Sequence, residues 1–327
     1  MTDLFSLVKD TGAYKIIKGD KDANRLSHAY LLLTPDGDNL EGYLKIFAKL
    51  IACNDGSPCN ECRTCTLIDN KTHADTVWFP KEKDVVLVED ISALIEDSFV
   101  KPLEGDKKLF VINHAETMNG PSQNKLLKTL EEPPKNVYIL IGATAEFPLL
   151  PTLKSRVKKL ELPVPDADKL YNALISDYPD GERLKEAIAC SDGTVGNAVA
   201  LYGDENLSEV LSLVADMLVN MQSSREVLEY SVKINGLKCD FSVFLSALKL
   251  TLRDMLVGVS GRYDLVNNKK IYEKTKMAKG YNEGAILYAL DTIDEALHRK
   301  KFNANAVMLT DWLLFQILEG KYKWQKS

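Results

Sequence analysis

Residues 124–163, NKLLKTLEEPPKNVYILIGATAEFPLLPTLKSRVKKLELP, decide the fold class. The stretch begins with the three- and four-residue apolar spacing of a helix, and a pair of prolines then ends that helix because proline lacks an amide donor. The inward face of this helix is expected to consist of Leu126, Leu127 and Leu130. The branched apolar run at 137–141 predicts a buried parallel strand, and 157–162 predicts another.

Similar short apolar runs recur in the first half of the chain. Further buried strands are predicted at 29–33, 85–88 and 109–112, and apolar positions in 40–51 predict an amphipathic helix. Alternation of strands and helices is typical of an α/β fold with a parallel sheet. From about residue 206 the pattern is helical only, with helices expected at 207–221, 223–232, 240–257, 281–298 and 304–318.

A chain of 327 residues is longer than one compact core, so we expect three domains. The first is an α/β domain at 1–162, with an inserted cysteine-rich module at 53–65. A small helical domain is expected at 163–204, following the break PVPDAD, with Leu170, Leu174, Leu184 and Ile188 inward. An all-α domain is expected at 205–327.

Composition and charge exclude several functional classes. With 45% hydrophobic and 27% charged residues, the chain has the composition of an ordinary globular protein. It contains no apolar run of about 18 residues, and its start, MTDLFSLVKDTG, lacks an apolar signal core, so we expect a cytoplasmic protein. A net charge of −6 argues against a chain that coats nucleic acid by itself, so any contact with DNA must be local or shared.

Four of the six cysteines lie together in CNDGSPCNECRTC. The two-residue spacings bring successive thiolates around one small loop, and Gly56 and Pro58 let the backbone turn back. Zinc favours tetrahedral cages of this kind, and four thiolates would leave no open position for catalysis. The expected ligands of a structural zinc ion are Cys53, Cys59, Cys62 and Cys65. Free thiols and an iron–sulfur cluster are the alternatives.

Two segments together carry a family resemblance. HAYLLLTPDGD at 28–38 leads into a helix ending in FAKLIAC and then into the cysteine loop, and 124–163 adds the order helix, double proline, strand and Ser-Arg. This order resembles subunits of bacterial DNA polymerase III clamp loaders, which are AAA+ proteins. The resemblance implies an AAA+ core with a zinc loop, a helical lid domain and a C-terminal collar domain. It also implies gamma/tau and delta subunits, the sliding clamp and primer-template DNA as partners.

Active members of that family hold ATP with a Gly-rich loop ending in Lys and then Ser or Thr. The corresponding loop contains Thr34, Gly37, Leu40 and Glu41, with Leu40 at the Lys position and Glu41 at the position of the hydroxyl that ligates magnesium. The resemblance also places Asn113 and His114 where the magnesium-binding Asp and the Glu belong, and Gly196 and Asn197 where a nucleotide-sensing Arg belongs. We therefore expect no productive binding of ATP.

Ser155 and Arg156 match the Ser-Arg-Cys motif of the family, except that Val157 replaces Cys. In that family the Arg reaches the γ-phosphate of ATP bound by the neighbouring subunit, as an arginine finger. The resemblance therefore implies that Arg156, with Ser155, acts in trans in catalysis. The alternative for Arg156 is a surface ion pair, worth about 0 to 1 kcal/mol.

Altered ATP-binding positions together with a retained Ser-Arg motif imply, by this resemblance, a non-hydrolysing subunit of the delta-prime class. Such a subunit is expected to have no independent enzymatic activity. One alternative is an ATP-hydrolysing subunit of the gamma or tau class, and another is a zinc-bearing adaptor outside replication. Four lysines are candidates for contact with DNA phosphates: Lys125, Lys128, Lys158 and Lys159. The alternative is that they form an ordinary solvated face. Cys190 and Cys239 are expected to be buried thiols without assigned chemistry.

Overall fold

A computed structural model describes residues 3–81, 85–237, 239–301 and 305–324. Its contacts divide these residues into two compact units. Unit 1 contains residues up to 177 together with 194–196, and unit 2 contains 178–193 and the residues from 197 onward. The expected division into three domains stays a prediction.

Unit 1 is built around a five-stranded parallel sheet in the order β2-β3-β4-β1-β5. The strands are β1 (Ala29–Leu33), β2 (Thr76–Phe79), β3 (Lys108–Ile112), β4 (Val137–Ala143) and β5 (Lys158–Glu161). Pairing of β1 with both β4 and β5 places the carboxyl ends of these three strands at one edge of the sheet. The loop after β1 and the loop after β3, which carries Asn113 and His114, leave from this edge.

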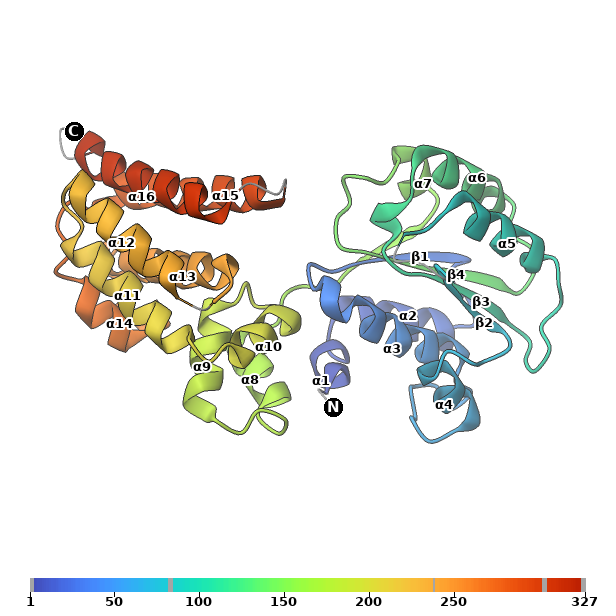
Figure 1. The fold of residues 1–327 in the computed structure, drawn as a ribbon. Coiled ribbons are helices and arrows are strands. Elements are labelled where there is room, and N and C mark those ends of the chain that lie inside the picture. Colours follow the sequence, from blue (N-terminus) through green and yellow to red (C-terminus); the bar gives the residue numbers. More distant parts are fainter. Residues whose placement is uncertain (1–2, 82–84, 238, 302–304, 325–327) are drawn as a thin grey trace. The chain divides into compact units, whose positions relative to one another are not determined.

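Helices cover both faces of the sheet (Figure 1). The helices of this unit are α1 (Leu4–Val8), α2 (Gly12–Asp22), α3 (Leu40–Ala52), α4 (Arg63–Asp69), α5 (Val88–Ser98), α6 (Gly120–Glu131), α7 (Pro151–Lys154) and α8 (Ala167–Leu174). Short 3-10 turns occur at η1 (Gly37–Asn39) and η2 (Ala115–Thr117). As in other parallel sheets, burial on both faces explains why β1 and β4 are continuously apolar.

Alternate residues of each strand face two separate cores. Tyr30 and Leu32 of β1 pack with the apolar faces of α2 and α3. Leu31, between them, packs with the opposite core, which contains Leu94 of α5 and Leu126 of α6. This two-residue alternation fixes the strand register, because a slip by one residue would exchange the two faces.

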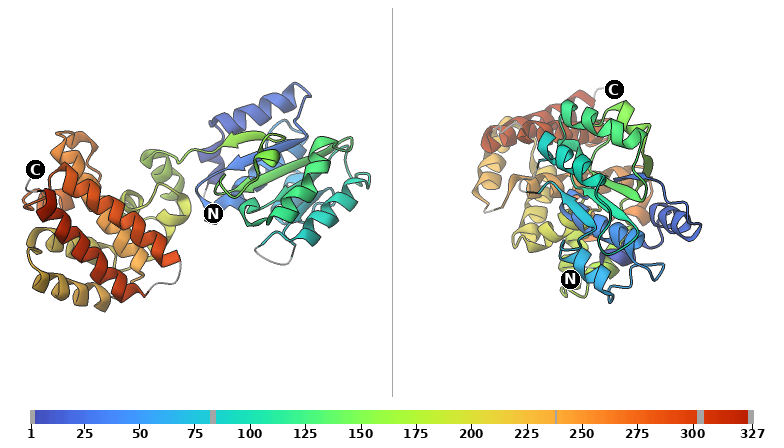
Figure 2. Two further views of the ribbon diagram at one scale, coloured as in Figure 1. Left: turned by 90° about the horizontal axis from the view of Figure 1, so that it is seen from above. Right: turned by 90° about the vertical axis from the view of Figure 1, so that its right-hand side faces the viewer.

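Unit 2 is all helical among its described residues, and Figure 2 shows its helices from two further sides. They are α9 (Gly181–Cys190), α10 (Val195–Gly203, of which the first two residues belong to unit 1), α11 (Leu207–Asn220), α12 (Ser224–Gly236), α13 (Phe241–Val259), α14 (Lys269–Thr275), α15 (Glu283–Lys301) and α16 (Ala306–Lys323), with a 3-10 turn, η3 (Tyr263–Leu265). One core joins α11, α12, α13, α15 and α16. Within the described residues, no helix is both long enough and apolar enough to cross a bilayer.

One expected strand was wrong. The apolar run at 85–88 is not a strand: it leads into α5, and the missing strand is β2, which begins at Thr76. Helix α14 was not expected. The last helix does not bury all of its apolar side chains, since Val307 is 51% and Phe315 is 38% exposed. Its expected start at residue 304 lies outside the described residues.

Candidate functional site

The loop between β1 and α3 contains the residues that the family resemblance aligns with a phosphate-binding loop. Thr34 is buried and donates its backbone amide to the carbonyl of Ala143, and Gly37 forms the 3-10 turn η1. Leu40, the first residue of α3, is fully buried and belongs to the core that α3 shares with the sheet. Glu41 pairs with Lys45 of its own helix at 3.0 Å and with Lys71 at 2.5 Å. Both side chains therefore have partners within unit 1 and do not face the loop as phosphate ligands would.

Asp36 fills the centre of this loop. Its side chain is 4% exposed and accepts hydrogen bonds from Asn39 Nδ2 at 3.1 Å and Tyr43 Oη at 3.0 Å. It also accepts hydrogen bonds from two backbone amides of the distant segment 194–196, those of Val195 at 3.1 Å and Gly196 at 3.3 Å. A role for Asp36 could not be predicted from its neighbours in the sequence, because its amide donors lie about 160 residues away.

The space beside Asp36 is small. A cavity lined by α1, the β1–α3 loop and the segment 162–165 has a volume of about 10 Å³, which is room for roughly one water molecule. Tyr43 closes this cavity on the side of α3, and burial raises the pKa of its hydroxyl, with the Asp36 carboxylate acting in the same direction. Tyr43 therefore stays a neutral hydrogen-bond donor to Asp36.

The carboxyl end of β3 carries Asn113 and His114, as expected, but the acidic group there is Glu116. His114 has a left-handed backbone, with φ at 53°, and its Nδ1 lies 3.0 Å from Glu116 Oε1. Burial alone would raise the pKa of Glu116, but hydrogen bonds from Thr144 and His114 hold the pKa below its ordinary value. The two side chains thus form a hydrogen-bonded group with Thr144, in agreement with a structural role for His114.

Gly196 faces the same loop from α10. A Cβ atom added to Gly196 would lie 2.5 Å from Asp38 Oδ2 and 2.6 Å from Asp38 Cβ. Any larger residue at this position would displace Asp38, so the position has room only for glycine as the loop stands. At Gly196 the backbone of α10 thus comes close to Asp38 of the loop.

The four cysteines of the module meet in a compact cluster. Their Sγ atoms all lie within 4.8 Å of one another. Cys53 Sγ is 3.7 Å from that of Cys59 and 3.8 Å from that of Cys62, and Cys59 Sγ is 3.8 Å from that of Cys65. Four sulfurs bound about 2.3 Å from a tetrahedral ion would lie about 3.8 Å apart. The cluster therefore fits a single metal ion with four thiolate ligands.

Two backbone amides donate hydrogen bonds to sulfurs of the cluster, and the bond to Cys62 favours its thiolate. The amide of Cys62 donates to Cys59 Sγ at 3.3 Å, and the amide of Cys65 donates to Cys62 Sγ at 3.4 Å. The second bond is the main reason why the pKa of Cys62 is lowered to about 7. Gly56 provides the turn with its φ of 75°, as its place in the motif predicted.

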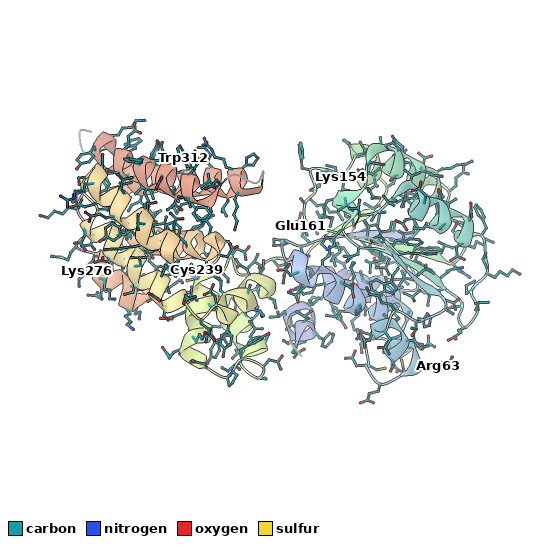
Figure 3. The ribbon with its side chains drawn as sticks, viewed as in Figure 1. Arg63, Lys154, Glu161, Cys239, Lys276 and Trp312 are labelled. Atoms are coloured by element: carbon teal, nitrogen blue, oxygen red, sulfur yellow. The ribbon has the colours of Figure 1, made fainter. Side chains whose placement is uncertain are left out.

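Two lysines connect the cysteine-rich module (53–65) to neighbouring helices of unit 1. Lys49 of α3 is 7% exposed, and its Nζ donates to Asn60 Oδ1 at 2.6 Å and pairs with Asp69 at 2.9 Å. Lys21 of α2 donates to the carbonyls of Leu50, at 2.7 Å, and Cys53. Arg63 at the start of α4, which Figure 3 labels, pairs with Glu104 of the loop before β3 at 3.1 Å.

Ser155 and Arg156 form the turn between α7 and β5. Arg156 Nη1 donates to the Thr152 carbonyl at 2.7 Å, and the guanidinium lies 3.3 Å from Ser155 Oγ. Arg156 Nη2 pairs with Glu131 Oε1 at 2.5 Å, while the Arg156 side chain remains 32% exposed. Glu131 is the last residue of α6, so the pair joins the helix and the Ser-Arg turn of the segment 124–163. Glu131 was not expected as the partner of Arg156.

The candidate DNA-binding lysines have mixed surroundings. Lys158 pairs with Asp20 at 2.5 Å, and Lys159 pairs with Glu146 at 2.6 Å. Lys159 also pairs at 2.8 Å with Glu161 of β5, and Figure 3 labels Glu161. Lys125 donates to a serine hydroxyl of α5. Carboxylates thus offset part of the positive charge of Lys158 and Lys159.

Comparison with known proteins finds similarity to subunits of DNA polymerase III. Residues 9–166 match the family described as DNA polymerase III, delta subunit. The chain is 25% identical to DNA polymerase III subunit delta' of Bacillus subtilis (strain 168), over 94% of this chain and 95% of that protein. It is 28% identical to DNA polymerase III subunit delta' of Pseudomonas aeruginosa PAO1, over 89% of this chain and 84% of that protein. The chain is therefore similar over most of its length to DNA polymerase III subunits of the delta' type.

The crystal structure of a DNA polymerase III, gamma subunit-related protein from Thermotoga maritima aligns with 93% of this chain and 99% of that chain. The TM-score is 0.43 and the sequence identity is 18%.

Proposed function

We propose that this chain is a clamp-loader subunit of the delta-prime class that hydrolyses no ATP itself and supplies Arg156 to ATP bound by a neighbouring subunit. The observation that carries the proposal is the filled β1–α3 loop, in which Asp36 occupies the centre and Leu40 is buried. A triphosphate would meet a buried carboxylate there instead of a lysine, and like charges at short range repel strongly. Arg156, by contrast, keeps a third of its side chain exposed.

The Arg156 turn suits a group that acts on another subunit. Bonds to Thr152 and Ser155 fix part of the guanidinium, and the rest pairs with Glu131, which is itself half exposed. An exposed ion pair of this kind is worth about 0 to 1 kcal/mol, so the phosphate of a neighbouring ATP can replace Glu131 at small cost. A guanidinium then spreads positive charge over the phosphoryl group that is being transferred.

The experiment replaces Arg156 with Ala and, as the matched control, Lys154 with Ala. Lys154 lies two residues away in α7, pairs with Glu146 and is labelled in Figure 3. Reconstituted loader is assayed for ATP hydrolysis stimulated by DNA and clamp, and assembly is checked by native mass spectrometry. Loss of an arginine finger slows its own site by about 10³-fold or more, so total turnover should fall by that site's share. Normal turnover in assembled R156A loader would refute the role of Arg156.

We propose that the four-cysteine cluster holds a structural Zn²⁺ ion. The spacing of the sulfurs supports zinc, and closure of the site by four thiolates supports a structural role, since a catalytic zinc keeps a position for water or substrate. Zinc binding would connect α3 to α4 and fix the loop that Lys49 holds against α3.

The proposed partners are the gamma/tau and delta subunits, with the sliding clamp and primer-template DNA reached inside the assembly, and the proposed location is the cytoplasm. An adaptor outside replication is the alternative, and co-purification with the polymerase III gamma/tau and delta subunits would exclude it. An ATP-hydrolysing subunit of the gamma or tau class is a second alternative. Equilibrium dialysis of the isolated chain with labelled ATP and Mg²⁺ separates the two classes, because micromolar binding would identify a motor subunit.

A further inference from the structure

The Asp36 carboxylate lies at the N-terminus of α10. Val195 and Gly196 are the first two residues of this nine-residue helix, and their amides have no partner within the helix itself. One amide donates to each carboxylate oxygen, that of Val195 to Oδ2 and that of Gly196 to Oδ1. These contacts place a full negative charge on the positive end of the helix dipole.

A similar arrangement of groups is one that proteins use to bind phosphate. In phosphate-binding loops, the loop after a parallel strand leads into a helix whose N-terminal amides hold the anion. In this protein the amides come from a different helix, α10, which is distant in the sequence. Here the anion is part of the chain, and its two oxygens have four different donors, because Tyr43 and Asn39 complete the shell. The whole carboxylate is buried, with 4% of Asp36 exposed.

We propose that Asp36 is a built-in anion that replaces a nucleotide phosphate, so that the segment 194–196 stays bound to the β1–α3 loop without any nucleotide. This inference extends the proposed function but does not depend on Arg156 or on assembly of a loader. It also explains Gly196, since the backbone must approach the loop closely enough for its amide to reach Asp36, and a side chain there would strike Asp38.

The substitution Asp36→Asn keeps the shape of the side chain and removes the charge. Both oxygens of Asp36 accept a backbone amide, so an asparagine must turn its NH₂ group toward either Val195 or Gly196 in any orientation. The matched control is Asp38→Asn in the same loop, which removes a charge of equal sign close to Gly196. Asp38 is exposed and belongs to the same 3-10 turn.

The measurement is hydrogen–deuterium exchange of the full-length chain, followed in peptides that contain Val195 and Gly196. Exchange in these peptides should be at least about tenfold faster in D36N, because a hydrogen bond to a charged group is worth a factor of ten or more in an opening equilibrium. D38N should exchange like the wild type. The proposal fails if D36N retains full protection, or if D36N and D38N lose it equally, which would indicate a general effect of charge.

A second variant tests whether the position is an anion site. Asp36→Gly removes the whole carboxylate, and sodium formate offers the same group as a small ion. Formate should restore protection of the 194–196 amides in D36G, whereas sodium chloride at equal ionic strength should not. Fast exchange in D36G that formate leaves unchanged would overturn the proposal, since Asp36 would then act by packing and not as an anion.

Discussion

Gly142 in β4 lies where α3 crosses the sheet at close range. A Cβ atom at this position would be 2.7 Å from Leu44 Cδ1 and 3.0 Å from Leu40 Cδ1, and both leucines are fully buried. Gly142→Ala should therefore lower the stability of the chain by about 1 to 3 kcal/mol, because an added methyl group must displace packed side chains. Thermal unfolding of the purified variant measures this loss.

Gly19→Ala is the matched control for this prediction. Gly19 lies inside α2, and no other atom is within 4 Å of an added Cβ at this position. Alanine should stabilise the helix there by about 0.5 to 1 kcal/mol, because glycine loses more backbone entropy on folding. Equal effects of the two substitutions would contradict the close packing of α3 on β4.

Lys321 of α16 is buried, with 1% of its surface exposed, and donates to the Met221 carbonyl at 2.7 Å. Burial lowers its pKa to about 8, from an ordinary value of 10.5. Because the folded pKa lies below the unfolded one, the unfolded state binds more protons between these values, and stability should rise with pH across this window. Below pH 8 the cost of burying the charged lysine is fully present.

The comparison of wild type with K321M isolates this effect, since methionine does not titrate. Between pH 7 and pH 10 the unfolding free energy of the wild type should rise relative to that of K321M by about 2 to 3 kcal/mol. Urea unfolding of both proteins at each pH gives this difference. Parallel pH curves for the two proteins would show that the pKa of Lys321 is not lowered.

At the scale of elements, the cysteine loop gives the sharpest test. Cys59→Ser removes one corner of the cluster, and the expected bound zinc should fall from one ion per chain to nearly none. Exchange of amides in 53–65 should become faster at the same time. Cys239→Ser, in unit 2 (Figure 3), is the control and should keep one zinc per chain. Retention of zinc by C59S, measured by elemental analysis, would contradict the ligand set.

The elements that the sequence predicted well are those with continuous or strictly periodic apolar residues. β1, β3, β4 and the long helices of unit 2 follow from their patterns, because burial on one or both faces sets the period. α5 was not expected, because its first residue, Val88, ends the branched run VVLV, which by itself resembles a strand. β2, with the sequence TVWF, is only four residues long and gives little periodicity.

At the scale of the whole molecule, the net charge limits what the chain can do alone. Carboxylates pair with Lys158 and Lys159, and the chain has a net charge of −6. The isolated chain should bind primer-template DNA with a Kd of about 10⁻⁴ M or weaker at physiological salt, the weak end of non-specific binding. Fluorescence anisotropy measures this affinity, and micromolar binding with a steep salt dependence would refute the prediction.

The candidate site was predictable where its residues are neighbours in the sequence. The four cysteines lie within 13 residues, and the turn Ser155–Arg156 is local, so motif and spacing were sufficient to propose them. Contacts that join distant segments were not predictable. The amides that reach Asp36 come from residues 195 and 196, and their place depends on how unit 1 gathers 194–196 into its fold.

A carboxylate that is covalently part of the loop has a consequence for regulation. A freely diffusing ligand occupies its site according to its concentration, whereas a tethered group has a fixed effective concentration that dilution does not change. The Asp36 contact with the amides of Val195 and Gly196 should thus be equally occupied whatever the cellular ratio of ATP to ADP. In a ring whose other members respond to adenylate levels, the loop of such a subunit would keep the same contact while its neighbours change conformation.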